Sequence, residues 1–214
     1  SCKGGFTMTE EQKELSGKIF NPRHPALKAI KSVAHKLCAD YNLSYEEEAE
    51  KRNEILAKLL GHKGDSVAFQ GPIFFNYGTH TSIGDGFWGN YNICIQDDAN
   101  VTIGNHVLFG PNCTLATPYH PFIADERRYM KDEKGELYGP CMAKPIVIED
   151  DVWLAANVTV CGGVTIGKGS IIGAGSVVTR DIPENVIAAG VPCRVIRKIT
   201  EEDSIHNRPE LFGS

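Results

Sequence analysis

The chain has 214 residues, 42% of them hydrophobic, which is enough for one sizeable core and a modest appendage. A formal net charge of -5 excludes the strong basic character expected of a protein that binds nucleic acid or an anionic membrane. No apolar run approaches the ~20 residues that a membrane-spanning helix needs, and the first residues lack the apolar stretch of a secretory signal. We therefore expect a cytoplasmic protein in which residues 1–8 are a disordered lead-in or a tag remnant.

Residues 9–62 have the pattern of a helical segment. Thr9 has a glutamine three residues later, the spacing of a capping box before a short helix. From Pro25, apolar residues recur at the spacing of one helix face, at Leu27, Ile30, Val33, Ala34, Leu37 and Tyr41. Ser44 and Glu47 predict a second capping box that opens a charged helix. The apolar sides of these helices need a partner, and we expect them to pack on the region that follows.

Residues 63–199 follow a period of six. Aliphatic side chains occur every sixth position at Ile148, Leu154, Val160, Ile166, Ile172 and Val178. The positions four residues after each are small or β-branched: Val152, Val158, Val164, Ser170, Ser176 and Ile182. A step of six residues turns an α-helix by about 600°, so these side chains could not share one helix face. Short strands joined by Gly- and Asn-containing turns do fit, and three repeats make one triangular coil of about 18 residues, so the pattern predicts a parallel β-helix.

The six-residue rhythm is interrupted twice. The register slips by two residues between Val101 and Ile103. A larger break covers residues 117–145, which are polar and proline-containing, and solenoids extrude such insertions as loops that often carry function. Residues 200–214 are expected to form a polar C-terminal tail.

His120 opens the long loop, between two prolines that restrict its backbone. A neutral imidazole suits a general base at neutral pH, but position alone leaves an ordinary loop histidine equally open. A zinc site like that of the gamma-class carbonic anhydrases would need histidines spaced by coils, and His80, His106 and His120 are 26 and 14 residues apart. Cys113 and Cys141 are near the loop but have no obvious activating setting for a nucleophile. We expect no metal.

Several motifs together resemble one family. The stretches WGNYN, DD, PYHP and AAGVPCRVIR, set among hexapeptide repeats, resemble the maltose and galactoside O-acetyltransferases. The resemblance runs from about Leu15 to about Ile199. It implies a left-handed parallel β-helix with an N-terminal helical segment and one extruded loop. It also implies a homotrimer, with acetyl-CoA as co-substrate in the groove between subunits.

The same resemblance assigns roles to residues. His120 matches the catalytic base, and Asn90 in WGNYN matches a residue that stabilises the developing oxyanion. Asp98 matches a carboxylate that holds the acceptor hydroxyl, and Trp88 matches an aromatic beside that pocket. For the cofactor, Ala156 and Ala174 match backbone contacts to the pantetheine arm. The positions expected near the adenosine phosphates are Thr179, Arg180, Arg194 and Arg197.

Two departures from the family pattern affect the acceptor side. Pro22 stands where the galactoside enzymes have an acidic substrate contact, and Asn76 stands where they have a serine that contacts substrate. Acetyl transfer to a sugar or glycoside hydroxyl is the function that the resemblance implies, by direct transfer without a covalent acetyl-enzyme. The alternative is a hexapeptide acetyltransferase for a xenobiotic or another small hydroxyl or amine acceptor. A carbonic anhydrase and a non-catalytic scaffold are the remaining interpretations.

Overall fold

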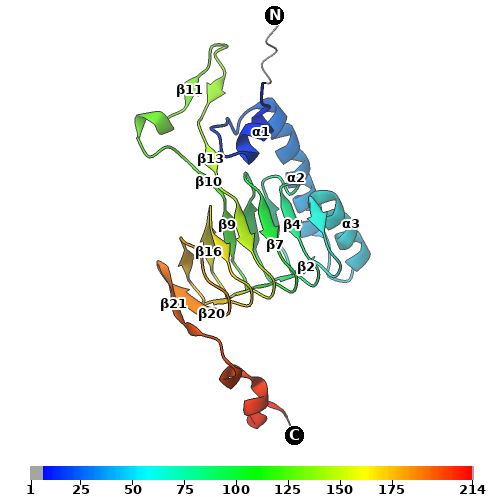
Figure 1. Ribbon diagram of the computed structural model, residues 1–214. Coiled ribbons are helices and arrows are strands. Elements are labelled where there is room, and N and C mark those ends of the chain that lie inside the picture. The colour runs from blue at the N-terminus through cyan, green and yellow to red at the C-terminus, as the bar shows by residue number, and fades with distance from the viewer. Residues whose placement is uncertain (1–6, 214) are drawn as a thin grey trace, which may run out of the picture.

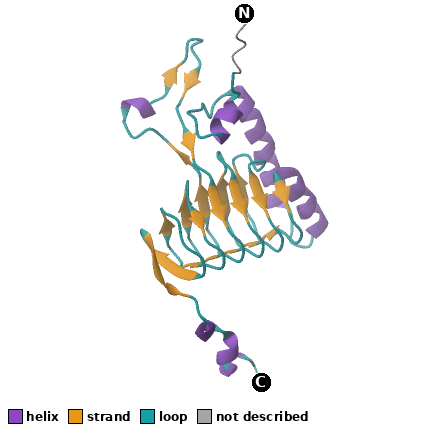
Figure 2. Cartoon of the chain, in the orientation of Figure 1, coloured by secondary structure: helices purple, strands orange, loops and turns teal. Residues whose placement is uncertain are grey.

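The computed structural model describes residues 7–213, so most of the expected lead-in, residues 1–8, lies outside the described residues. Three helices cover one end of a prism of stacked strands, a long loop projects from one corner, and the C-terminal segment extends from the other end (Figure 1 and Figure 2). In the part of the chain that the structure describes, no helix is long and apolar enough to cross a membrane.

The N-terminal helices are α1 (Glu10–Leu15), α2 (Pro25–Leu43) and α3 (Ala49–Leu59). The capping box at Thr9 is confirmed, because the Thr9 side chain accepts from the Gln12 amide and the Gln12 side chain accepts in return. His24 caps α2, since its Nδ1 accepts from the Ala26 amide. The apolar face of α2 buries Leu27, Ala34, Cys38 and Tyr41.

The expected capping box at Ser44 and Glu47 is wrong. Ser44 ends α2, and its amide donates to the Tyr41 carbonyl at 3.1 Å. Its hydroxyl donates to the same carbonyl and accepts from Arg52 Nε at 2.9 Å, so it is not free to cap the next helix. The turn before α3 is closed instead by Glu48, whose carboxylate accepts from the Tyr45 amide at 2.7 Å.

The strands stack into three faces of a parallel β-helix, numbered here in chain order. Face 1 consists of β1 (His62–Lys63), β4 (Thr81–Ile83), β7 (Val101–Ile103), β14 (Ile146–Ile148) and β17 (Thr165–Ile166). Face 2 consists of β2 (Ala68–Phe69), β5 (Trp88–Gly89), β8 (Leu108–Phe109), β15 (Trp153–Leu154), β18 (Ile171–Ile172), β20 (Val186–Gly190) and β21 (Cys193–Lys198). Face 3 consists of β3 (Ile73–Phe75), β6 (Ile93–Gln96), β9 (Thr114–Ala116), β16 (Thr159–Cys161) and β19 (Val177–Val178). The predicted parallel β-helix is thus confirmed, with one antiparallel pair, β20 and β21, at its end.

The six-residue repeat places its aliphatic side chains in the core. All six residues of the regular run, from Ile148 to Val178, are fully buried, and the positions four residues after each are at most 4% exposed. Ser170 and Ser176 replace aliphatic residues in this second set, and their hydroxyls donate to the Pro183 and Gly173 carbonyls. The core tolerates these two polar side chains because each finds a partner.

The slip of two residues has a structural location. In the early coils partners are 20 residues apart, as in Ile83 and Ile103, whereas later partners such as Ile148 and Ile166 are 18 apart. The extra residues lie where face 3 turns into face 1, a place we call the 3/1 corner (residues 76–80, 97–100, 117–145, 162–164 and 179–181). The long loop leaves from this same corner. Every interruption of the repeat is therefore concentrated at one edge of the prism.

The loop itself is partly ordered by short pairings. β10 (Pro118–Tyr119) pairs with β13 (Met142–Ala143), and β11 (Met130–Lys131) pairs with β12 (Leu137–Tyr138), both antiparallel. A 3-10 turn, η1 (Asp125–Arg127), lies between β10 and β11. Beyond β21, the C-terminal segment forms the 3-10 turns η2 (Glu201–Asp203), η3 (Ile205–Asn207) and η4 (Pro209–Leu211). These turns project away from the prism (Figure 2).

The helices close the first coil of the β-helix. The Tyr41 hydroxyl donates to the Phe69 carbonyl at 2.7 Å. The Asn42 side-chain amide bonds both backbone groups of Ile73, at 2.9 and 2.7 Å, and so replaces the missing strand beside β3. An edge strand left open would be a template for aggregation, so α2 serves as a cap.

Candidate active site

Three of the expected site residues lie along the 3/1 corner. Asn76 directly follows β3, Asp98 lies one coil further on after β6, and His120 follows β9 and β10 at the root of the long loop. The Asn76 side-chain amide donates to Asp98 Oδ1 at 2.7 Å. Asn76 also lines a hollow of about 320 Å³ between α2 and face 3, together with the exposed ring of Phe74. Asn76, Asp98 and His120 follow one another at intervals of 22 positions in the sequence, and the coils stack them on one edge.

The two aspartates of the DD pair have different structural roles. Asp97 is fully buried and accepts from the Tyr77 amide and the Thr81 hydroxyl, each at 2.8 Å, so it fastens one coil to the preceding one. Asp98 is 4% exposed and is held by Asn76. Burial raises the pKa of Asp98, and the hydrogen bond from Asn76 opposes that shift. Only Asp98 has a carboxylate oxygen left for another donor.

His120 is exposed at the loop root, and its ring orientation is fixed from one side. Its Nδ1 is 3.1 Å from the Pro140 carbonyl oxygen. A carbonyl oxygen only accepts, so Nδ1 carries the hydrogen in this contact. The neutral ring then has its lone pair on Nε2, the form that a general base requires.

Three other expected residues lie at a different corner. Asn90, Ala156 and Ala174 occupy the turns where face 2 passes into face 3, which we call the 2/3 corner (residues 70–72, 90–92, 110–113, 155–158 and 173–176). The Ala156 carbonyl accepts from Gly175 at 2.9 Å, so the two alanines stand in adjacent coils. The Asn90 side-chain oxygen accepts from the Tyr91 amide at 2.8 Å, which leaves its NH₂ group as a donor. The width of face 3 separates this corner from His120.

Trp88 does not join Asn76 and Asp98 within the chain. It lies on the outer side of face 2, where Trp88, Leu108 and Trp153 are in register on adjacent strands. Each is between 40% and 47% exposed, so they form an apolar column along this face. Exposed apolar patches of this kind mark interaction surfaces.

The expected phosphate-binding residues are divided as well. Thr179 and Arg180 lie at the 3/1 corner after β19, whereas Arg194 and Arg197 lie on β21 of face 2. Both terminal nitrogens of Arg197 bind Asp203, at 2.9 and 2.7 Å. This pairing lowers the pKa of Asp203 to about 2 and ties η2 to β21. Arg197 is therefore already engaged by the C-terminal segment.

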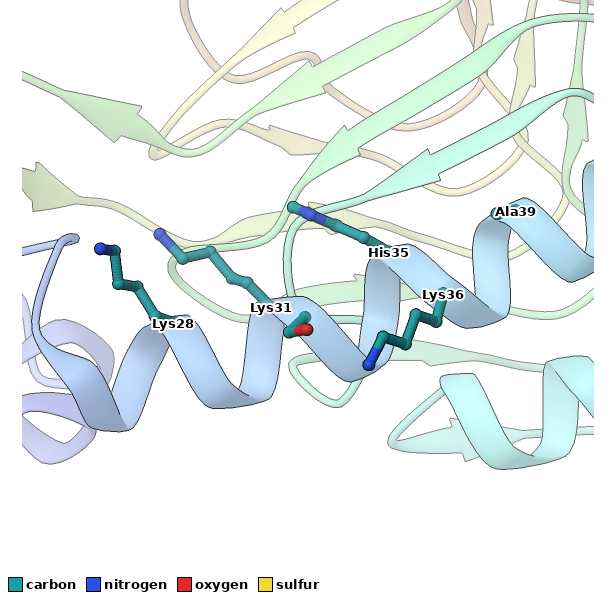
Figure 3. A pocket seen from close by; sticks show the side chains of 6 residues that line it. Lys28, Lys31, His35, Lys36 and Ala39 are labelled. Atoms are coloured by element: carbon teal, nitrogen blue, oxygen red, sulfur yellow. The ribbon is translucent and has the colours of Figure 1, made fainter.

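The sequence alone does not reveal a cluster of Glu14, Tyr77 and Lys31 near Asp98. Glu14 on α1 is fully buried beside Tyr77, and Lys31 on α2 reaches over the Tyr77 ring at 5.8 Å. Lys31 projects from the same side of α2 as Lys28 and His35 (Figure 3). No sequence signal identifies Glu14, because an acidic residue in a short helix is ordinarily a solvated one.

Within residues 7–213, no group of three or more His, Cys, Asp or Glu side chains is placed to hold a metal ion. His106 illustrates the reason. It lies at a turn between face 1 and face 2, in a left-handed conformation with φ 55°, and its corner differs from that of His80 and His120.

The parallel β-helix of six-residue repeats, its helical N-terminal cap and the histidine on its extruded loop fit the class of hexapeptide-repeat acyltransferases. The family models agree: a maltose acetyltransferase hexapeptide capping motif matches residues 13–64, and a bacterial transferase hexapeptide model of six repeats matches residues 145–180. The galactoside O-acetyltransferase of Escherichia coli K12 is 40% identical over 198 residues, which cover 92% of this chain and 93% of the relative.

Two solved structures are similar to this chain over most of its length. A maltose O-acetyltransferase from Clostridium difficile 630 has a TM-score of 0.83 and 38% identity, covering 91% of this chain and 99% of the other. A galactoside acetyltransferase in complex with coenzyme A has a TM-score of 0.83 and 37% identity, covering 92% and 94%. The chain belongs to the maltose and galactoside O-acetyltransferase family, and it is an acetyltransferase.

Proposed function

We propose that this protein transfers the acetyl group of acetyl-CoA to a hydroxyl of a sugar or glycoside, with His120 as the general base. The observation that carries this proposal is the 3/1 corner. There, a histidine held by Pro140 through Nδ1 shares an edge with the Asn76–Asp98 pair. Membership of a family whose relatives are named galactoside and maltose O-acetyltransferases supports the same reaction.

His120 Nε2 would remove the proton of the acceptor hydroxyl as its oxygen attacks the acetyl carbonyl carbon. A new C–O ester bond forms, the C–S bond of the thioester breaks, and the proton passes from the imidazolium to the departing thiolate. Positioned acid–base groups of this kind contribute ~10²–10⁴ to rate. The free oxygen of Asp98 would accept a hydrogen bond from the acceptor and hold it for attack. No covalent acetyl-enzyme is needed for this balance.

Charge develops on the carbonyl oxygen during the attack, and Asn90 is the proposed donor to it. Its side-chain oxygen is fixed by the Tyr91 amide, so its NH₂ group is preorganised to donate. Loss of one such donor typically costs ~10²–10³ in kcat.

Asn90 and His120 lie at opposite edges of face 3, so one copy of the chain does not bring them together. The three residue-to-residue steps along β6, from Ile93 to Gln96, alone span about 10 Å at the usual strand rise. A homotrimer would solve this, because the 2/3 corner of one copy would meet the 3/1 corner of its neighbour. The apolar column of Trp88, Leu108 and Trp153 supplies a surface for that contact.

The cofactor side follows the same division. Acetyl-CoA would run along the groove between copies, past Ala156 and Ala174 toward the cations at Arg180 and Arg194. The coenzyme A complex of the galactoside acetyltransferase neighbour supports this class of co-substrate.

The six cysteines in the described part of the chain are all free, in keeping with the expected cytoplasmic location.

The first test is a thiol-release assay with acetyl-CoA against sugars, glycosides and, for the alternative acceptor class, antibiotics and small amines. We expect turnover with a sugar or glycoside. His120→Ala should lower kcat by about 10²–10⁴ with little change in the KM for acetyl-CoA, since the base acts on the acceptor.

His62→Ala is the matched control, because His62 is an exposed histidine on β1 at the capped end of the prism. It should leave kcat unchanged. Near wild-type turnover by His120→Ala with the best acceptor would rule out the assigned base, and turnover restricted to antibiotics or amines would favour the alternative.

A further inference from the structure

Glu14 occupies an unusual environment for a carboxylic acid. It lies on α1, its side chain is fully buried, and neither Oε1 nor Oε2 has a hydrogen-bond partner of good geometry. The carboxyl lies against the Tyr77 hydroxyl, which is also buried and also without such a partner. Isolated buried charge is costly, so a carboxyl with no firm donor favours its neutral form.

The groups around Glu14 come from five elements of the fold. They are Glu11 on α1, Lys31 on α2, Tyr77 after β3, Asp98 after β6 and Cys141 before β13. His80 stands just behind them, stacked on the Tyr77 ring at 4.5 Å and bonded to Glu11 Oε1 at 2.9 Å. Lys31 is the one cation named in this set, and its Nζ already donates to the Pro22 carbonyl at 2.7 Å.

Two of the three carboxyl groups in this cluster, Asp98 and Glu14, meet different donors. Asp98 receives the Asn76 amide at 2.7 Å. The donor beside Glu14 is the Tyr77 hydroxyl, and desolvation raises the pKa of Glu14 to about 9. Where the environments of two neighbouring carboxyl groups differ in this way, their pKa values differ, and so do their chemical roles.

We propose that Glu14 is a positioning residue of the acceptor side, which keeps its proton at neutral pH and so leaves Asp98 as the single ionised carboxylate of the pair. This proposal rests on the proposed function only through the role of Asp98. With Glu14 neutral, the Asp98 carboxylate remains anionic and able to accept the acceptor hydroxyl. Once Glu14 ionises, a second negative charge adjoins Asp98, and acceptor binding weakens.

The first experiment detects the proton on the Glu14 carboxyl group directly and needs no acceptor substrate. Infrared difference spectra of the folded protein, wild type minus Glu14→Gln, should show the carbonyl band of a protonated carboxylic acid at pH 7. Glu11→Gln is the matched control on the same helix, and it should retain the band. Absence of the band from folded wild-type protein at pH 7, or its persistence in Glu14→Gln, overturns the proposal.

The second experiment measures function across pH. The KM for the acceptor should rise severalfold as the pH passes about 9, while the KM for acetyl-CoA stays level. Glutamine keeps the size and neutral state of the side chain, so Glu14→Gln should abolish that rise. A purely structural role of Glu14 would alter stability but would not remove the rise of the acceptor KM at high pH. An unchanged rise in Glu14→Gln therefore contradicts the proposal. If no acceptor is turned over, the proposed function fails while the infrared result still decides the state of Glu14.

Discussion

At the residue scale, the chemistry of this chain depends on which neighbour each side chain meets. Asp97 and Asp98 are adjacent and identical, yet Asp97 accepts from two groups of the preceding coil whereas Asp98 retains a free oxygen at the site. His120 has its tautomer set by a carbonyl that is 20 positions away in the sequence. These roles follow from the partners supplied by stacked coils and by the returning strand of the loop.

The raised pKa of Glu14 in the folded state also leads to a prediction about stability. Its folded pKa of about 9 lies above the ordinary value of 4.5, so the native state binds more protons than the unfolded state between these pH values. The stability of the wild type should therefore fall as pH rises through this window, with a contribution from Glu14 of up to about 1.4 kcal/mol per pH unit. Glu14→Gln should be the more stable protein at pH 8.

The measurement is urea unfolding at pH 5.5, 7 and 8.5 (roughly even steps across that window), with both proteins at the same concentration. The difference in unfolding free energy should widen with pH. Parallel curves for the two proteins would show that Glu14 is already ionised when folded.

At the element scale, the six-residue repeat sets which side chains enter the core, and only one corner of the prism departs from it. The regular run buries every sixth side chain, and the deviations are confined to the 3/1 corner. Two extra residues per early coil widen that corner without disturbing the ladders of the three faces. A solenoid can thus hold a site at one edge, because each coil tolerates changes in its turns more readily than in its strands.

The inward positions should therefore be sensitive to truncation. Leu154→Ala removes a fully buried side chain from the middle of face 2, and we expect a loss of about 2–5 kcal/mol in unfolding free energy. Leu43→Ala, at a residue 80% exposed at the end of α2, is the matched control and should change stability by less than about 0.5 kcal/mol. Denaturant midpoints at one protein concentration distinguish the two, and similar losses would contradict the assignment of the core.

At the scale of the whole molecule, the described residues place the two halves of the proposed site on different corners. Asn90 and the two alanines line the 2/3 corner, while His120, Asp98 and Asn76 line the 3/1 corner. The apolar column on face 2 is exposed in the single chain. Both features are expected of a subunit whose site is completed by a neighbour.

Mixed assemblies test this arrangement. Asn90→Ala and His120→Ala should each be inactive alone, because every site in a homotrimer lacks one group. Co-expressed at equal levels, the two variants should recover about a quarter of wild-type activity, since one intersubunit site in four would combine an intact His120 with an intact Asn90. Native mass spectrometry verifies that mixed trimers form. Mixed trimers without recovered activity would show that each site is built within one chain.

The six-residue pattern of the sequence predicted the fold, and the resemblance to the family supplied the candidate residues. A period of six is incompatible with a helix and buries one side chain per repeat, so the parallel β-helix could be deduced from local pattern alone. His120 stood out because it opens the one long break in that pattern, and the resemblance of PYHP, WGNYN and DD to the family assigned its role. The helix boundaries were less secure, and the capping box at Ser44 failed because Arg52, eight residues away, competes for the same hydroxyl.

Tertiary structure alone decided how these residues combine. Stacking of 20-residue coils brings Asn76 to Asp98, the returning loop brings Pro140 to His120, and the docking of α1 buries Glu14 against Tyr77. No local pattern encodes such contacts, because the partners belong to different coils and helices. The sequence therefore specified what each residue could do, and burial and long-range hydrogen bonding selected which of those properties it has.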